Sequence, residues 1–74
     1  MRAKLKQDLI DKTRLTYGLT LVLKDDVDRI RSYTGEFDID NMYEAVRDAT
    51  DTVDKLLDIL AHIEYFLYLE KLES

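Results

Sequence analysis

The sequence predicts an all-α protein, an antiparallel hairpin of two long helices. The 74 residues contain no proline and only two glycines, apolar residues recur at alternating spacings of three and four, and a single turn-forming segment lies near the middle. The predicted order is a helix over about residues 2–33, a turn at 34–37 and a helix over about residues 38–72. Because a chain of this length without cysteine is one domain (residues 1–74) with a marginal core, we expect it to dimerise into a four-helix bundle.

The first helix has the less regular pattern. Its apolar and small residues follow the three-and-four spacing at Leu5, Leu9, Thr16, Leu19, Leu23, Ile30 and Tyr33. Lys12 and Asp26 occupy positions in the same row. Gly18 lies in the middle, where glycine costs about 1 kcal/mol relative to alanine. A break there would give helices over about 2–16 and 19–33, and the chain would then be a three-helix bundle.

The turn is predicted from the residues that end one helix and begin the next. Gly35 can adopt the left-handed conformation that ends a helix. Asp38 can accept hydrogen bonds from the free N–H groups that begin the second helix. Phe37 and Met42 have the spacing of a hydrophobic staple around that cap. We therefore expect the chain to fold back at Gly35.

The second helix carries the most regular apolar row in the sequence. Nine residues follow the three-and-four spacing without exception: Ile39, Met42, Val46, Ala49, Val53, Leu56, Leu60, Ile63 and Leu67. A seven-residue repeat of this length predicts coiled-coil packing, either within the hairpin or between two copies of the chain. Folding at Gly35 would place residue i opposite residue 72 minus i, and would pair Leu5 with Leu67, Leu9 with Ile63, and Leu19 with Val53.

The end of the second helix has more apolar surface than one seam can cover. From Leu56 onward, apolar residues go nearly all round the helix, which indicates burial on more than one side. A partner-docking surface is predicted at Tyr65, Phe66, Tyr68, Leu69 and Leu72. Tyrosine and phenylalanine are common in interface hot spots. The alternative interpretation is that these residues form the dimer core or cover the beginning of the first helix.

An acidic face is predicted on the second helix. It consists of Asp40, Glu44, Asp48, Asp51, Asp54 and Asp58. The formal net charge of −5 argues against direct nucleic-acid binding, which requires clustered Lys and Arg. A straight row of carboxylates can instead resemble a phosphate backbone and occupy a basic groove. The simpler interpretation is a solvated face without a function of its own.

The sequence does not predict an enzyme, a metal site or a cofactor. Cysteine is absent, there is no glycine-rich phosphate loop, and His62 is the only histidine. Asp58 lies one turn before His62, so the two could bind a metal ion or transfer a proton. The Glu-x-x-His repeat of di-metal bundles is absent, because Ile59 stands where the glutamate is needed. The acidic residues near the turn also lack the spacing of a calcium-binding loop.

We therefore expect a small acidic regulator or inhibitor, antitoxin-like or phage-type, that binds another protein and pairs with itself as a homodimer. The alternatives are a nucleic-acid-mimicking inhibitor and a purely structural self-assembly module. A cytoplasmic location is expected, because the first residues lack the apolar run of a secretory signal. No membrane association is expected, because the stretch from Leu19 to Leu23 is too short to span a bilayer.

Overall fold

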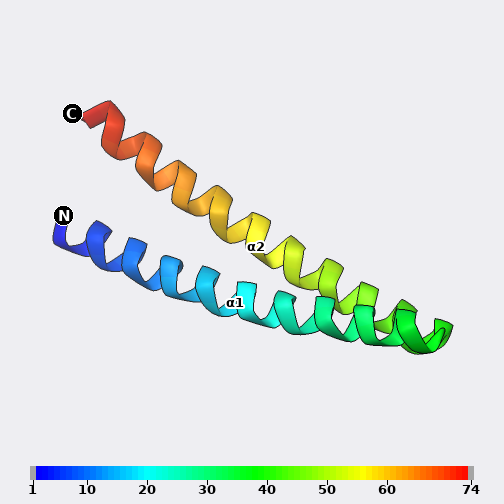
Figure 1. The fold of residues 1–74 in the computed structure, drawn as a ribbon. Helices are drawn as coiled ribbons and strands as arrows, with labels where there is room; N and C mark the ends of the chain where they lie inside the picture. Colours follow the sequence, from blue (N-terminus) through cyan, green and yellow to red (C-terminus); the bar gives the residue numbers. More distant parts are fainter. Residues whose placement is uncertain (1, 74) are drawn as a thin grey trace.

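A computed structural model of the chain describes residues 2–73 and shows two helices, α1 (Arg2–Glu36) and α2 (Ile39–Glu73). The helices pack against each other as an antiparallel hairpin, and both ends of the chain lie at the end opposite the turn (Figure 1). The hairpin measures 54 × 16 × 13 Å, which agrees with 35 helical residues rising about 1.5 Å each. The predicted all-α hairpin is confirmed. Neither helix, over the described residues, has an apolar segment long enough to cross a membrane.

Helix α1 is continuous through Gly18, so the predicted alternative of a break there is wrong. A Cβ atom added at Gly18 would meet nothing within 4 Å, so no neighbouring chain segment requires a glycine. The threonines on either side are accommodated within the helix, and their hydroxyls bond to backbone carbonyls of the preceding turn. Thr16 donates to the Lys12 carbonyl at 2.8 Å, and Thr20 donates to the Tyr17 carbonyl at 2.6 Å.

Helix α1 ends later than predicted, and a different residue ends it. Gly35 is still helical, whereas Phe37 takes the left-handed conformation with a φ of 55°. The Phe37 N–H donates to the Thr34 carbonyl at 3.2 Å, and the Asp38 N–H donates to the Tyr33 carbonyl at 2.9 Å. These two bonds form the Schellman motif, which satisfies carbonyls at the end of α1. The prediction that Gly35 would fill this role is therefore wrong.

Asp38 caps the beginning of α2, as predicted. Its Oδ1 accepts the Asn41 backbone N–H at 3.3 Å, and its Oδ2 accepts the Asn41 side-chain amide at 2.7 Å. Its carbonyl accepts the Met42 N–H at 2.9 Å and begins the helical hydrogen bonds. The hydrophobic staple is not formed to any large extent, because Phe37 is 80% exposed and little of its ring packs on Met42.

The α1 row that faces α2 follows the predicted spacing. Its members are all buried or half-buried: Leu5, Leu9, Lys12, Thr16, Leu19, Leu23, Asp26, Ile30 and Tyr33. The predicted register is wrong by five to six residues. Arg29 bonds to Asp48 rather than lying opposite residue 43, and Asp26 lies beside Thr52 rather than opposite residue 46. The turn itself lies farther along the chain than predicted, at residues 37 and 38.

The structure divides the row predicted on α2 into two. The residues of α2 that pack toward α1 are Met42, Ala45, Ala49, Thr52, Leu56, Ile59, Ile63 and Phe66, each buried or half-buried. They include four members of the predicted row, namely Met42, Ala49, Leu56 and Ile63. The other five members are Ile39, Val46, Val53, Leu60 and Leu67, and these remain 38–56% exposed along one side of the hairpin.

The two helices lie close together near the turn and diverge toward the chain ends (Figure 1). The four buried residues of the described chain are Asp26, Ala45 and Thr52, in the half nearer the turn, and Leu56, at the middle of α2. Near the turn, α2 presents the small side chains of Ala45, Ala49 and Thr52; farther along it presents Ile59, Ile63 and Phe66. Because the distance between helix axes depends on the side chains at the contact, this change in size accounts for the divergence.

Replacing Gly18 with alanine should stabilise the protein. The change Gly18→Ala lowers the entropy of the unfolded chain and adds a methyl group that meets no neighbour, so the free energy of unfolding should rise by about 1 kcal/mol. Urea denaturation followed by circular dichroism measures this. Gly35→Ala, at the end of α1, should give a smaller gain. A loss of stability in Gly18→Ala would show that the helix does bend at this position.

Candidate interaction surfaces

Five carboxylates form an exposed row on α2, which we call the acidic stripe. Its members are Asp40, Glu44, Asp51, Asp54 and Asp58. Among the described residues, none of these carboxylates forms an ion pair or a hydrogen bond with another side chain. Asp48, the sixth predicted member of the acidic face, bonds instead to Arg29 of α1. Five of the six predicted carboxylates are therefore exposed along α2. The sixth, near the middle of the row, takes part in the contact between the helices.

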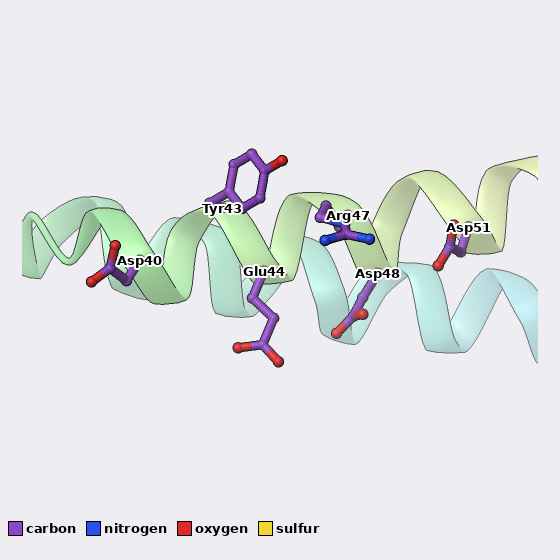
Figure 2. A pocket seen from close by; sticks show the side chains of 6 residues that line it. All are labelled: Asp40, Tyr43, Glu44, Arg47, Asp48 and Asp51. Carbon is purple, nitrogen blue, oxygen red and sulfur yellow. The ribbon is translucent and has the colours of Figure 1, made fainter.

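A shallow depression of about 490 Å³ lies over the beginning of the acidic stripe. It is lined by Asp40, Tyr43, Glu44, Arg47, Asp48 and Asp51, all from α2, and Figure 2 shows these side chains projecting from that one helix. The guanidinium carbon of Arg47 lies 6.0 Å from the centre of the Tyr43 ring. Because a single helix supplies the whole lining, the depression has no opposing wall. It can contact the surface of a partner but cannot enclose a small molecule.

A polar cluster lies between the helices in the half nearer the turn. Arg29 donates through Nη2 to Asp26 Oδ1 at 2.6 Å and to Asp48 Oδ2 at 3.0 Å, so one guanidinium joins α1 to α2. Asp26 is only 6% exposed. The Thr52 hydroxyl lies 3.5 Å from Asp26 Oδ2 and 3.1 Å from the Asp48 carbonyl oxygen. Asp26 lies in the seam, where an unpaired charge would be costly. The Arg29 guanidinium beside its carboxylate provides the opposite charge.

The electrostatics of this cluster depend on Arg29. Hydrogen bonds to Asp48 and then to Asp26 raise the pKa of Arg29 above its usual value, because both carboxylates stabilise the charged guanidinium. Arginine is already charged throughout the physiological range, so this shift leaves its protonation unchanged. The cluster has the properties of a structural contact between the two helices.

The C-terminal part of α2 carries a second exposed surface, which we call the aromatic surface. It consists of Tyr65, Tyr68, Leu69 and Leu72, which are 57%, 58%, 39% and 65% exposed. Phe66, the fifth predicted member, is half-buried in the seam, and its ring centre lies 6.2 Å from that of Tyr65. Four of the five predicted docking residues are thus accessible, and one contributes to the hairpin.

The small side chain of Ala61 leaves hollows on both sides of Tyr65. One hollow of about 360 Å³ is lined by Ala61, Glu64, Tyr65 and Tyr68. The other, also about 360 Å³, is lined by Ala61, His62 and Tyr65. A tyrosine ring flanked by depressions can insert between the side chains of a partner and receive one in turn, which is the arrangement of interface hot spots.

His62 does not pair with the Asp58 carboxylate. Its Nδ1 lies 2.8 Å from the Asp58 carbonyl oxygen, so the ring N–H donates to the backbone of the preceding turn. The carboxylate and the imidazole are therefore not arranged as a proton-transfer pair. Within residues 2–73, no group of three or more histidine and carboxylate side chains is placed to hold a metal ion.

Comparison of the chain with known protein families, with characterised proteins and with solved structures found no match. The features of the chain that bear on its function are the acidic stripe, the aromatic surface and the exposed apolar residues.

Removing the Arg29 side chain should destabilise the hairpin. In Arg29→Ala, the buried Asp26 carboxylate loses the cation beside it, and the contact between the helices through Asp48 is lost. The urea midpoint should fall clearly below that of the control Arg31→Ala, which changes an exposed arginine of the same helix.

The companion variant Asp26→Leu removes the buried charge and leaves an apolar side chain in the seam. It should retain or exceed the stability of the parent chain, and adding Arg29→Ala to it should cause little further loss. Equal midpoints for Arg29→Ala and Arg31→Ala would show that the cluster does not contribute to the hairpin.

Proposed function

We propose that this protein is a small regulator or inhibitor that binds another protein, works as a homodimeric four-helix bundle and has no catalytic activity. The observation that carries the proposal is the exposure of the aromatic surface beside a seam that is already occupied. Tyr65, Tyr68 and Leu72 are each more than half exposed on α2 and are not covered by α1. Clustered tyrosines at a solvent-exposed surface are the usual residues of a binding hot spot.

The shape of the aromatic surface supports binding of a protein rather than a small molecule. The hollows beside Ala61 are open and lie on a single helix, so they suit side chains presented by another protein surface. Each tyrosine combines an apolar ring with a hydroxyl, and this allows both packing and a hydrogen bond at the edge of an interface.

The second candidate is a nucleic-acid-mimicking inhibitor, and the acidic stripe is the observation that favours it. Its five carboxylates are exposed and unpaired among the described side chains, along a straight helix. Two features rank this candidate second. Arg47 lies within the depression at the beginning of the stripe, and Asp48 is engaged by Arg29.

The two candidates predict opposite sensitivities to mutation. The double variant Tyr65→Ala/Tyr68→Ala should weaken binding of a captured partner by about 10- to 100-fold, and added salt should have little effect. Tyr17→Ala is the matched control, because Tyr17 is 67% exposed on α1 outside the aromatic surface. Co-purification with tagged protein, followed by titration of the partner, measures both effects.

Charge reversal of the acidic stripe completes the test. The triple variant Glu44→Lys/Asp51→Lys/Asp54→Lys leaves Asp48 and its contact with Arg29 intact, so the fold should be preserved. It should leave partner binding within a few-fold of the parent chain. Loss of binding in this variant alone would favour the nucleic-acid mimic. Recovery of no protein other than the chain itself would favour the structural self-assembly module and contradict the proposed function.

A further inference from the structure

One side of the hairpin carries two parallel rows of uncharged side chains, which we call the uncharged flank. From α1 it contains Thr13, Thr20, Val27 and Thr34, and from α2 it contains Ile39, Val46, Val53, Leu60 and Leu67. Members of each row are seven residues apart, so each row runs straight along the edge of the seam. All nine are exposed in the hairpin. One more step along the α1 row reaches Lys6, the first charged residue on this side.

The threonines of the uncharged flank are already hydrogen-bonded within α1. The hydroxyl of Thr13 donates to the Leu9 carbonyl at 2.7 Å. The corresponding distances are 2.6 Å from Thr20 to the Tyr17 carbonyl and 2.7 Å from Thr34 to the Ile30 carbonyl. Because these donors are satisfied, covering the flank would not leave a buried hydroxyl without a partner. The surface is therefore suited to an interface free of water.

The opposite side of the seam has a different character. Its positions are filled by Asp8, Leu15, Val22, Arg29 and Glu36 of α1 and by Asn41, Asp48, Lys55, His62 and Leu69 of α2. Five of these ten residues carry a formal charge. Depletion of charge distinguishes the buried centre of an interface from the rest of a protein surface. The uncharged flank is thus the side of the hairpin that has the composition of an interface.

The accessible area of the hairpin leaves room for such an interface. The hairpin exposes 6106 Å², whereas a compact monomer of 8.7 kDa exposes about 4,700 Å². The excess is about 1,400 Å² for each chain and belongs to the elongated hairpin as a whole. Covering a little over half of it on each of two copies would bury about 1,600 Å² in total, which is the area of a standard stable interface.

We propose that the uncharged flank is the interface between two copies of this chain, in which α2 of one copy packs antiparallel on α2 of the other about a two-fold axis near Val53. This inference rests on the homodimer that forms part of the proposed function and identifies the surface that builds it. Val53 is the middle member of the α2 row, so it meets the same residue of the second copy. Leu60 then packs on the second copy's Val46, and Leu67 packs on its Ile39.

The antiparallel arrangement follows from the difference between the two rows. It places the apolar α2 row on itself and the threonine-rich α1 row on itself, so like packs on like. The other two-fold arrangement, with the axis along the helices, would pack the apolar α2 row of each copy on the threonine-rich α1 row of the other. Since the acidic stripe and the aromatic surface lie on the side of α2 turned away from the flank, this dimer leaves both accessible to a partner protein.

Disulfide cross-linking tests the position of the two-fold axis. The chain contains no cysteine, so Val53→Cys introduces a unique thiol. Mild oxidation should convert most of this variant to a covalent dimer, because residues at a two-fold axis come within disulfide distance of each other. Asp54→Cys is the matched control, because Asp54 is the next residue in the chain and lies on the acidic stripe. This variant should remain mostly monomeric on denaturing gels under the same conditions.

Light scattering over a range of concentrations, combined with circular dichroism, tests the same surface without a cross-link. The parent chain should have the mass of a helical dimer. Val53→Glu should raise the dissociation constant by at least about 100-fold, because it buries two unpaired carboxylates next to each other. Leu15→Glu, on the opposite side of the seam, should leave the dimer intact.

The outcomes separate the flank from the rest of the proposed function. A parent chain that is monomeric at all concentrations would overturn both the homodimer and the flank. A dimeric parent chain in which Asp54→Cys cross-links as well as Val53→Cys, or in which Val53→Glu stays dimeric, would overturn the flank alone. Binding of a partner protein through Tyr65 and Tyr68 is measured independently and stands or fails separately.

Discussion

Two helices that form a hairpin share a single seam, so each helix can cover only one stripe of its surface. Most features of this protein follow from that constraint, because α2 carries apolar residues on more than one stripe. The apolar residues buried in the described chain are Ala45 and Leu56, whereas seventeen large apolar side chains remain more than a third exposed. A core of this size gives little stability to an isolated chain. The exposed apolar residues are therefore the part of the structure that is available for assembly and for binding.

The seam itself changes along its length. Near the turn, small side chains allow the helices to approach, and the contact from Arg29 to Asp26 and Asp48 holds one register. Farther from the turn, larger side chains separate the helices. Burying a carboxylate costs free energy, and this cost offsets much of the favourable attraction to its cation. An ion pair at a seam position therefore contributes more to the choice of register than to net stability. The hairpin thus has a well-defined end at the turn and a more open end at Leu5 and Phe66.

Helix α2 presents three different surfaces around its circumference. One packs on α1, a second forms the larger part of the uncharged flank, and the third carries the acidic stripe followed by the aromatic surface. In the dimer that we propose, the first two surfaces are occupied and the third faces outward. Such a division lets one helix support self-assembly and partner binding at the same time, because the residues for each purpose lie on separate faces.

The sequence by itself determined the two helices, the Asp38 cap and the α1 row, because each depends on contacts within a few residues or on one clear periodicity. It did not determine the seam of α2. The predicted row and the observed row share Met42, Ala49, Leu56 and Ile63, and both have three-and-four spacing, so periodicity alone cannot separate them. The tertiary structure decided between them through the contacts with α1. Asp26 lies beside Thr52 and Arg29 bonds to Asp48, so the side of α2 that carries Ala45 and Thr52 faces α1. The more apolar residues of the predicted row, from Ile39 to Leu67, are left on the outside.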